Sequence, residues 1–404
     1  MTTLEYRLKP GKETRLTRGS VWAFRNEIDF NEKDPGNGHL VRLLTSKGRP
    51  IGVGFMNTAS NLCFRMLARH GEFPLEADAW TIVETRLKQA LDVRGPRVPA
   101  NGARRLIFGE GDWLSGLIVD DYAGHLAIQV HSWGIERLKP KILEALKALT
   151  GCLSIVDRSD NGFRTKEGLP SVKGILFAAP GIDEAALSKI AFDEDGLSFQ
   201  ADLIAGHKTG FFLDQRPARA LARSLAKGRR CLDVFCFSGG FSVSLAKGGA
   251  TSVLGLDQSA DAIAQAAAHA ALNGVESLCK FEEADAFTRL RELEKAGERF
   301  GLIVLDPPAM AKDGEAVGGA LRGYKELNLR ALRLLEPGGL LITCSCTQVV
   351  SETQFCQEVQ SAAQDAPATV RELQRLGAGP DHPRLLGMEE THYLKCLLLR
   401  KDQA

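Results

Sequence analysis

The sequence predicts an α/β protein whose C-terminal part is a doubly wound sheet, preceded by a β-rich N-terminal part and a central α+β part. From residue 5 to residue 70, short β-like runs alternate with Gly, Asn and Pro turns. The segment Arg105 to Ser132 is typical of hairpin-like strands, and a helix is expected at 135–149. From Leu197 onward, strand, turn and helix repeat, which indicates a sheet covered by helices on both faces.

Length and composition limit the classes of protein that this chain can belong to. With 404 residues, of which 44% are hydrophobic and 25% charged, it is expected to fold into more than one domain. The boundaries that we predict are 1–75, 76–190 and 191–404. The charged N-terminal stretch does not resemble a signal peptide, and no apolar run is long enough to span a bilayer. We therefore expect a cytoplasmic protein with no membrane partner.

Cysteine content and charge narrow the expectations further. Nine cysteines, without a C-x-x-C motif, indicate reduced thiols and neither zinc nor an iron-sulfur cluster. The net charge of +1 excludes a polycation. Residues 1–75, however, hold twelve Lys and Arg against seven Asp and Glu. This local excess of positive charge could bind a nucleic acid, or it could be an ordinary solvated surface.

A glycine-rich turn opens the C-terminal repeat of strands and helices. The segment Cys231 to Ala250 predicts a strand, a turn at Ser238-Gly239-Gly240 and a helix, an arrangement in which the backbone can approach a ligand. The spacing G-x-G-x-x-G is absent, which argues against a pyrophosphate cradle. A cofactor with an amino acid end could lie over such a turn.

Acidic residues end the next two predicted strands. Asp257 follows the strand that comes roughly 20 residues after the glycine turn, a position suited to accepting both hydroxyls of a ribose. Asp285, beside Ala286 and Phe287, ends the third strand, where an acid next to apolar groups could hold an adenine. A single acid at a strand end is more often a turn or cap residue, but three such acids in order together with the glycine turn favour a ligand-binding role.

Two later strands end in reactive groups. The runs LIVLDPP and LLITCSC place Asp306 and Cys346 after strands that an amphipathic helix connects, so both groups should open onto one cleft. The prolines fix Asp306 in an extended conformation. Enzymes that methylate an exocyclic amine of a nucleic acid base usually carry an aromatic residue after this motif, and Ala309 stands there instead.

Cys346 offers a different chemistry. A thiolate that adds to carbon 6 of a pyrimidine creates an enamine whose carbon 5 can accept a methyl group. The alternative is a buried structural thiol, because free cysteine is among the most buried residue types. We assign that role to Cys344, which lies deeper in the same strand.

These motifs resemble the S-adenosylmethionine-binding half of class I methyltransferases. Nearly the whole chain resembles the bacterial large-subunit (23S) ribosomal RNA cytosine-5 methyltransferases that carry an N-terminal PUA RNA-binding domain. The motifs that carry the resemblance are Gly206 to Arg216, DVFCFSGGFS, LDPPA, TCSCT, Asp381-His382-Pro383 and HYLKCLLL.

The resemblance implies S-adenosylmethionine as the cofactor and 23S ribosomal RNA, free or in a large-subunit particle, as the partner, with a homodimer as a further possibility. It implies Cys346 as the nucleophile and Asp306 at the base edge, also beside the cofactor. The other cofactor-binding residues that it implies are Phe211, Asp233, Phe235, Ser238, Gly239, Asp257, Asp285 and Ala286. The RNA-facing residues are Lys208, Gln215 and Arg216, while Asp214 is expected to cap the following helix.

Alternatives remain open at this point. The enzyme could methylate another RNA base, with Cys346 structural, or the chain could be a non-catalytic RNA-binding assembly factor. A small-molecule methyltransferase would leave residues 1–190 without a purpose. A second basic stretch could extend an RNA track or be a solvated loop, and it comprises Arg158, Arg164, Lys166 and Lys173.

Overall fold

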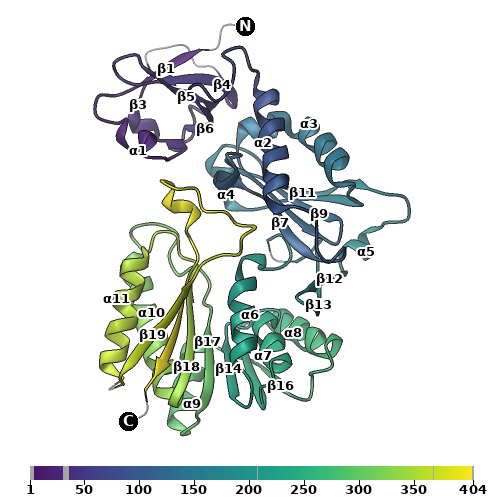
Figure 1. Ribbon diagram of the computed structural model, residues 1–404, viewed down its shortest axis with the longest axis vertical. Helices are drawn as coiled ribbons and strands as arrows, with labels where there is room; N and C mark the ends of the chain where they lie inside the picture. Colours follow the sequence, from purple (N-terminus) through teal and green to yellow (C-terminus); the bar gives the residue numbers. More distant parts are fainter. Residues whose placement is uncertain (1–3, 31–35, 207, 367, 403–404) are drawn as a thin grey trace. The chain divides into compact units, whose positions relative to one another are not determined.

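The chain folds into two units, each built on its own sheets (Figure 1). The computed structural model describes residues 4–30, 36–206, 208–366 and 368–402; His207, in the motif from Gly206 to Arg216, lies outside them. The chain passes between the units several times. The N-terminal unit comprises Met1–Asp193, Gln200–Leu213 and Pro380–Thr391, and the C-terminal unit comprises Glu194–Phe199, Asp214–Gly379 and His392–Ala404.

The first sheet of the N-terminal unit has six strands in the order β2-β6-β5-β4-β1-β3. Strands β4, β5 and β6 form an antiparallel meander, and β1 pairs with β4 in parallel. Side chains such as Tyr6, Val41 and Met66 fill its core. The elements are β1 (Glu5–Leu8), α1 (Thr14–Thr17), β2 (Trp22–Ala23), η1 (Arg25–Glu27), β3 (Ile28–Asp29), β4 (His39–Leu44), β5 (Pro50–Met56) and β6 (Phe64–Arg69).

The second sheet of this unit has five strands in the order β11-β10-β9-β8-β7. Helix α3 connects the parallel strands β9 and β10, whereas the other pairs are antiparallel. Phe55 and Leu67 of the first sheet join Leu87 and Ile142 in one core, so the two sheets are packed together. The elements are α2 (Ala79–Arg94), β7 (Ala103–Phe108), η2 (Gly109–Asp112), β8 (Leu117–Tyr122), β9 (His125–Val130), α3 (Trp133–Thr150), β10 (Ser154–Ser159), α4 (Gly162–Lys166), β11 (Val172–Ala178), α5 (Glu184–Leu187) and, later in the chain, η4 (Glu389–Thr391).

The C-terminal unit contains a seven-stranded sheet in the order β16-β15-β14-β17-β18-β20-β19. Strands β14 to β18 are parallel, and β20 and β19 are antiparallel to their neighbours. The hairpin of β12 (Ile190–Glu194) and β13 (Leu197–Ala201) precedes it. The elements of the sheet and its helices are η3 (Leu213–Gln215), α6 (Arg216–Leu225), β14 (Arg230–Val234), α7 (Gly240–Lys247), β15 (Ser252–Asp257), α8 (Ala260–Leu272), β16 (Cys279–Glu283), α9 (Ala286–Lys295), β17 (Phe300–Leu305), α10 (Val317–Leu334), β18 (Leu335–Ser345), α11 (Glu352–Asp365), β19 (Val370–Leu376) and β20 (Lys395–Lys401).

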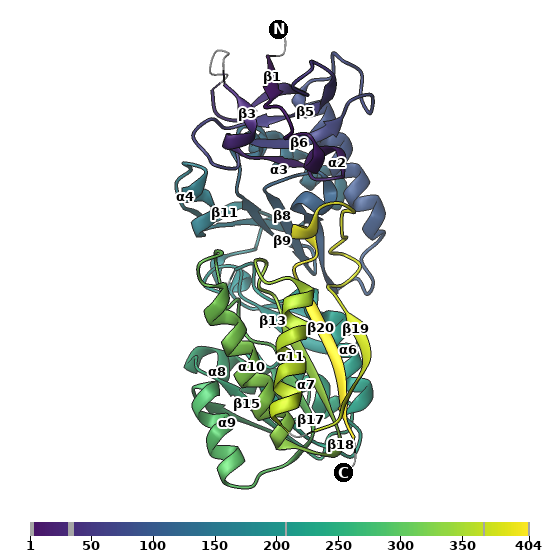
Figure 2. The same cartoon turned by 90° about the vertical axis from the view of Figure 1, so that its left-hand side faces the viewer.

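Helices cover both faces of this sheet, which confirms the predicted doubly wound class. Helices α6, α7 and α8 pack side by side on one face, and α9, α10 and α11 pack on the other (Figures 1 and 2). All residues of β17 are buried, and Phe300, Ile303 and Leu305 lie in the core beneath α9 to α11. The strand order reverses between β14 and β17, the topology that places ligands beyond the carboxyl ends of these strands.

Candidate active site

The ends of β17 and β18 bring together the two reactive groups that the sequence singles out. Leu305 of β17 lies opposite Thr343 of β18 in parallel register, so Asp306 and Cys346 leave the sheet at the same edge. The Cys346 thiol donates a weak hydrogen bond over 3.7 Å to the carbonyl oxygen of Pro307. The Asp-Pro-Pro turn and the segment that carries Cys346 are therefore in direct contact.

The half-buried Asp306 carboxyl accepts a side-chain hydrogen bond from the residue before α6. Nε2 of Gln215 donates to Oδ1 of Asp306 at 2.7 Å. Burial raises the pKa of Asp306 to about 7, and the nearby carboxyl groups of Asp214 and Asp233 contribute to the rise. At neutral pH this carboxyl is therefore present in both protonation states and can donate or accept a proton.

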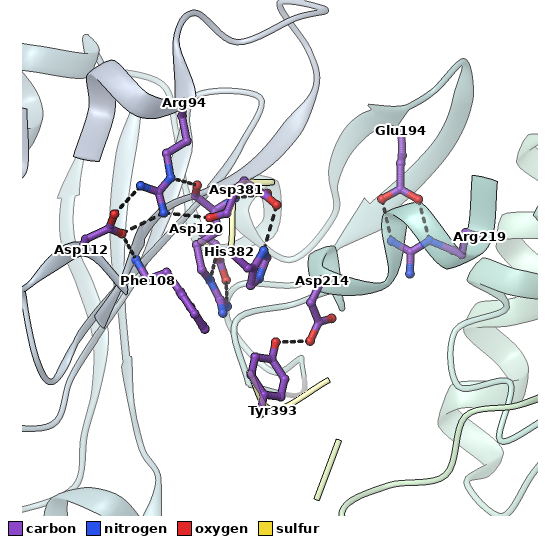
Figure 3. Close-up of polar contacts among 11 residues, drawn as sticks. Arg94, Phe108, Asp112, Asp120, Glu194, Asp214, Arg219, Asp381, His382 and Tyr393 are labelled. Carbon is purple, nitrogen blue, oxygen red and sulfur yellow. Dashed lines mark hydrogen bonds and ion pairs between the residues drawn. The ribbon is translucent and has the colours of Figure 1, made fainter. Parts of the chain in front are cut away.

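Gln215 reaches Asp306 from the start of α6. The prediction that Asp214 caps this helix is wrong, because Gln215 is the residue before α6 and makes no side-chain cap bond. Asp214 instead accepts a hydrogen bond from the Tyr393 hydroxyl (Figure 3). Its carbonyl oxygen also accepts from the backbone N–H of Gly379 at 3.1 Å. These contacts fix the start of α6 and leave the Gln215 amide directed at Asp306.

A strained turn follows β14. Phe235 has φ +67° and Phe237 has φ +45°, in the left-handed region that bulky residues rarely adopt. Asp257 holds the turn, because its Oδ2 accepts from the backbone N–H of Phe237 at 2.9 Å. Backbone strain of this kind persists only where the surrounding structure enforces it, and it is concentrated at functional sites.

Gly239 in this turn has a packing role in addition to the one predicted. Its φ is +78°, and a Cβ at this position would lie 2.9 Å from Cβ of Ala266 on α8. The glycine thus allows α8 to approach the turn closely. The buried His269 on the same helix forms a hydrogen bond of 2.8 Å through Nδ1 with the carbonyl oxygen of Ser238.

Asp233, at the end of β14, is completely buried. Its Oδ2 accepts a hydrogen bond of 2.6 Å from the Ser242 hydroxyl on α7. Within the described part of the chain, no donor reaches its Oδ1. Burial raises the pKa of Asp233 to about 7. A buried carboxyl with an unused oxygen is the kind of group that a cationic ligand would stabilise.

Asp257 and Asp285 occupy the ends of the next two strands, as predicted from the sequence. Oδ1 of Asp257 accepts from the backbone N–H of Ser259 at 3.0 Å, in addition to its contact with the strained turn. Asp285 caps α9 by accepting from the backbone N–H of Thr288, and these hydrogen bonds lower its pKa. The buried Ala286 follows it. Both carboxyl groups retain lone pairs that could accept from a ligand.

The two cysteines at the end of β18 differ as the sequence predicts. Cys344 is completely buried and lies opposite Cys396 of β20. The neighbouring Cys396 thiol and burial raise the pKa of Cys344 well above its usual value, so it is a core thiol. Cys346 is only partly buried, beyond the last residue of the strand. Reactivity toward a ligand is therefore possible for Cys346 and not for Cys344.

Comparison with known families identifies the family and its cofactor. Residues 181–400, more than half of the chain, match the S-adenosylmethionine-dependent methyltransferase family, and residues 7–69 match a PUA-like domain. The chain belongs to the S-adenosylmethionine-dependent methyltransferase family. The predicted cofactor, the methyltransferase sheet and the N-terminal PUA-like domain are thereby confirmed.

Related proteins match almost the full length of this methyltransferase. The Ribosomal RNA large subunit methyltransferase I of Shewanella denitrificans is 36% identical over 402 residues, covering 98% of this chain and 99% of the relative. The protein of the same name from Tolumonas auensis is 35% identical and covers 99% and 100% of the two chains. A solved structure from Streptococcus mutans, assigned as a SAM-dependent methyltransferase, has the same fold, with a TM-score of 0.83 at 19% identity over 98% of this chain and 100% of that chain.

The residues of this methyltransferase at the switch point fit the cofactor. S-adenosylmethionine carries an ammonium and a sulfonium, and the unused Oδ1 of Asp233 is a buried acceptor suited to a cation. The Gln215 Oε1 is also buried and has no hydrogen-bond partner among the described residues. Two buried acceptors without a donor, one on β14 and one at the start of α6, are difficult to explain without a ligand.

Three predicted residues make contacts within their own units. Phe211 belongs to the N-terminal unit, where it is 6% exposed and its ring packs edge-on against Phe192 at 5.2 Å. Lys208, in the same unit, is exposed with its Nζ 4.7 Å from the centre of the Phe212 ring. Arg216 pairs with Asp195 at 2.5 Å on the surface of the C-terminal unit. Their roles in binding stay predictions.

The second basic stretch is neither a continuous RNA track nor a solvated loop. Arg158 is buried and donates to the carbonyl oxygens of Leu203 and Gly206, at 3.3 Å and 2.5 Å. Arg164 is 1% exposed and pairs with Glu136 at 2.7 Å. Sequence reasoning missed this because it cannot show which of several basic residues are buried. Only Lys166 and Lys173 of the stretch are exposed.

The Asp381-His382-Pro383 motif is part of a buried polar cluster in the N-terminal unit (Figure 3). Oδ2 of Asp381 accepts from the backbone N–H of Arg105 at 2.9 Å, and its Oδ1 is 2.8 Å from Nδ1 of His382. Arg94 joins the carbonyl oxygen of Asp381, at 2.8 Å, to the carboxylate of Asp112, at 2.5 Å. The motif thus anchors the 380–391 segment to this unit.

Sequence reasoning missed a polar network beside Cys346. The Tyr324 hydroxyl forms hydrogen bonds of 2.7 Å and 2.9 Å with the hydroxyls of Thr347 and Ser345, and Thr347 Oγ1 accepts from the backbone N–H of Met310 at 3.0 Å. The buried Lys395 lies close by. A lysine inside the apolar run HYLKCLLL was the available signal, because a buried charge needs a specific partner.

The described residues contain neither a candidate metal site nor a candidate membrane-spanning helix. No group of three or more His, Cys, Asp or Glu side chains in the described ranges could hold a metal ion. None of the helices in those same ranges has both the length and the apolar character needed to cross a membrane.

Proposed function

We propose that this methyltransferase transfers a methyl group to carbon 5 of a cytosine in large-subunit ribosomal RNA, with Cys346 as the nucleophile. Relatives that match the full chain carry the name Ribosomal RNA large subunit methyltransferase I, which supports ribosomal RNA as the substrate. The choice of base rests on the contact between the Cys346 thiol and the Asp-Pro-Pro turn. Carbon 5 of cytosine is a poor nucleophile, and a thiol beside a proton donor is the pair that activates it.

The first step joins the enzyme to the base. The Cys346 thiolate forms a bond from Sγ to carbon 6 of the cytosine. The electron pair of the C5–C6 double bond moves to join carbon 5 to carbon 4, and the C4–N3 pair moves to ring nitrogen 3. Protonated Asp306 donates its proton to that nitrogen and becomes a carboxylate, a step that its pKa of about 7 allows at neutral pH. Carbon 5 is then part of an enamine and is nucleophilic.

The second step transfers the methyl group and releases the enzyme. Carbon 5 forms the bond to the methyl group with the second electron pair that it shares with carbon 4, and the electron pair on nitrogen 3 re-forms the double bond to carbon 4. S-adenosylmethionine, when bound, would supply this methyl group and keep the electron pair of its broken S–C bond. When a base removes the carbon 5 proton, the electrons of that C–H bond re-form the double bond to carbon 6. The bond to Sγ breaks, its electron pair returns to Cys346 as a thiolate, and Asp306 recovers its proton from nitrogen 3.

The residues proposed to bind the cofactor follow the strand ends in order. Asp257 would accept from the ribose hydroxyls, and Asp285 with Ala286 would hold the adenine. The methionine end would lie against Asp306, Phe211 and the turn after β14, which contributes Asp233, Phe235, Ser238 and Gly239.

The RNA contacts proposed lie outside these strand ends. Lys208, Gln215 and Arg216 would contact the RNA, and the PUA-like part would bind it away from the target base. We keep 1–75, 76–190 and 191–404 as the proposed domain boundaries.

The product of the reaction tests this proposal directly. The protein is incubated with isotopically labelled S-adenosylmethionine and unmodified large-subunit ribosomal RNA, and the nucleosides are separated and weighed by mass spectrometry. We expect the label on carbon 5 of cytosine. Label on guanine or adenine would refute the cytosine assignment, and no label on free RNA or on large-subunit particles would favour a non-catalytic assembly factor.

The covalent bond is tested through Cys346. Cys346→Ala should abolish transfer, whereas Cys356→Ala removes another partly buried thiol, on α11, and should retain it. RNA containing 5-fluorocytosine should become attached to the wild-type protein, because carbon 5 then carries no proton to remove and the thiolate cannot leave. Undiminished transfer by Cys346→Ala would exclude the covalent mechanism.

A further inference from the structure

Lys395 is a buried lysine held beside the proposed nucleophile. It is the first residue of β20 and lies opposite Ser345, so it is paired with the residue that precedes Cys346. Its side chain is 4% exposed, and Nζ donates to the carbonyl oxygens of Thr347 and Val350 at 2.8 Å each. The amine therefore closes the turn that carries Cys346.

The geometry leaves one donor of this amine for a further partner. An ammonium has three N–H groups, and the two carbonyl oxygens account for two of them. Burial lowers the pKa of Lys395 to about 8, and the charges of Cys346 and Glu352 oppose that shift. Glu352 pairs with Arg375 at 2.7 Å, which satisfies its charge at the surface. Of the two groups whose negative charge opposes the shift, Cys346 is the one that the proposed mechanism uses.

The described neighbours Tyr324 and Asp306 add no positive charge beside Cys346. Burial raises the pKa of Tyr324 on α10 to about 12, and the negative charges of Cys346 and Asp306 add to the rise. Tyr324 therefore stays a neutral phenol at neutral pH. Asp306 is an acid. A carboxylate charge on Asp306 would destabilise a thiolate at Cys346, which then needs a cation nearby to form.

We propose that Lys395 is a positioning residue for the covalent step, whose ammonium holds the Cys346 turn and stabilises the thiolate before attack and after release. This inference rests on the proposed function, because it assigns a partner to the same nucleophile. No proton leaves Lys395 in the step. Its charge lowers the energy of the thiolate, and the bonds that form and break are those between Cys346 and the base.

A matched lysine allows the electrostatic role to be separated from a structural one. Lys401 lies at the other end of β20, is half-buried, and donates to the carbonyl oxygens of Leu332 and Leu335 at 2.9 Å and 3.0 Å. Burial lowers its pKa as well. Lys395→Met and Lys401→Met thus remove the same kind of contact, but only the first lies beside Cys346.

The test measures thiol reactivity without RNA or cofactor. Full-length wild type and both variants are treated with iodoacetamide across a range of pH, and alkylation of the Cys346 peptide is followed by mass spectrometry. In Lys395→Met, the pH profile of Cys346 alkylation should move upward by about one pH unit. The reaction at neutral pH should then be roughly tenfold slower than in wild type. Lys395→Arg should restore most of the rate, and Lys401→Met should follow wild type. A Lys395→Met profile equal to wild type would overturn the inference.

A second measurement does not depend on the folding of a Lys395 variant. The NMR signal of the Lys395 amine, whose pKa is about 8, is followed as a function of pH in wild-type protein and in Cys346→Ser. Loss of the thiolate should lower its midpoint, because the two charges stabilise each other, and an unchanged midpoint overturns the inference. Full methyl transfer by Cys346→Ala would instead overturn the covalent function itself, so the two failures are distinguishable.

Discussion

Replacing Asp233 by Asn should stabilise the C-terminal unit in alkaline solution while weakening the cofactor site. Asp233 is completely buried, accepts one hydrogen bond from Ser242, and has an Oδ1 that no donor among the described residues reaches. Asparagine has nearly the shape of a neutral carboxylic acid and cannot ionise. The variant therefore resembles wild type at low pH, where Asp233 is protonated, and differs from it where wild type must carry a buried charge.

The raised pKa of Asp233 sets the size and sign of the effect. Its pKa is about 7 in the folded chain, and an aspartate in an unfolded chain has a value of about 3.9. Because folding raises the pKa, the stabilisation is fully present below about pH 4 and is lost as the pH rises through about 7. Each pKa unit corresponds to about 1.4 kcal/mol, so a difference of roughly three pKa units lowers the unfolding free energy of wild type by at most about 4 kcal/mol at high pH.

The assay compares urea unfolding of wild type and Asp233→Asn at about pH 5 and about pH 8. All four tryptophans lie in the N-terminal unit, so far-UV circular dichroism and hydrogen exchange on β14 replace fluorescence. We expect the advantage of the variant over wild type to be roughly 3 kcal/mol larger at the higher pH, because only about 1.4 kcal/mol of it is present one pH unit above the unfolded pKa. Asp285→Asn is the control, because its pKa is lowered and its effect should not change over this range. A difference between wild type and Asp233→Asn that is independent of pH would refute the reasoning.

Three further predictions concern the same unit. Gly239→Ala should lower the free energy of unfolding by about 1–3 kcal/mol, because the added Cβ would lie 2.9 Å from Cβ of Ala266. A variant as stable in urea as wild type would contradict this packing argument. Arg219→Met should cost about 3–5 kcal/mol by leaving Glu194 buried and unpaired. The double variant Arg219→Met, Glu194→Met should recover most of the lost unfolding free energy, measured by thermal unfolding. No recovery would argue against a stabilising role of the buried ion pair. S-adenosylmethionine should bind more tightly as the pH rises through about 7, since ionised Asp233 attracts its ammonium; calorimetry showing equal affinity would count against this.

The sequence predicted the sheet and its strand ends well, because both depend on local patterns. The strand SVLGLD is β15 as predicted, and the apolar run that ends in Asp306 is β17. Parallel strands that are buried on both faces produce continuous apolar runs, and the polar residue that ends such a run marks the edge of the sheet. This is why Asp257, Asp306 and Cys346 could be located before their neighbours were known.

The side-chain partners could not be predicted in the same way. Gln215 contacts Asp306 across 91 residues of sequence, and Tyr393 contacts Asp214 across 179. The expected cap at Asp214 followed a sound local rule, but a distant hydroxyl competed for the same carboxylate. Arg164 likewise has the sequence context of a surface residue and is buried by a distant Glu136. Long-range pairing of this kind leaves no periodic signal in the sequence.

The two halves of the candidate site differ in how completely their polar groups are satisfied. Around Cys346, the hydroxyl of Tyr324 and the amine of Lys395 both have partners on the turn, so this half is preorganised by the protein alone. Around Asp233, a carboxyl lacks one partner and the following turn contains residues with positive φ. Such a region is costly for the unliganded fold, and a cationic cofactor would relieve part of that cost. The difference is what the proposed function requires, in which a preorganised Cys346 acts on the base while the cofactor binds and leaves in each cycle.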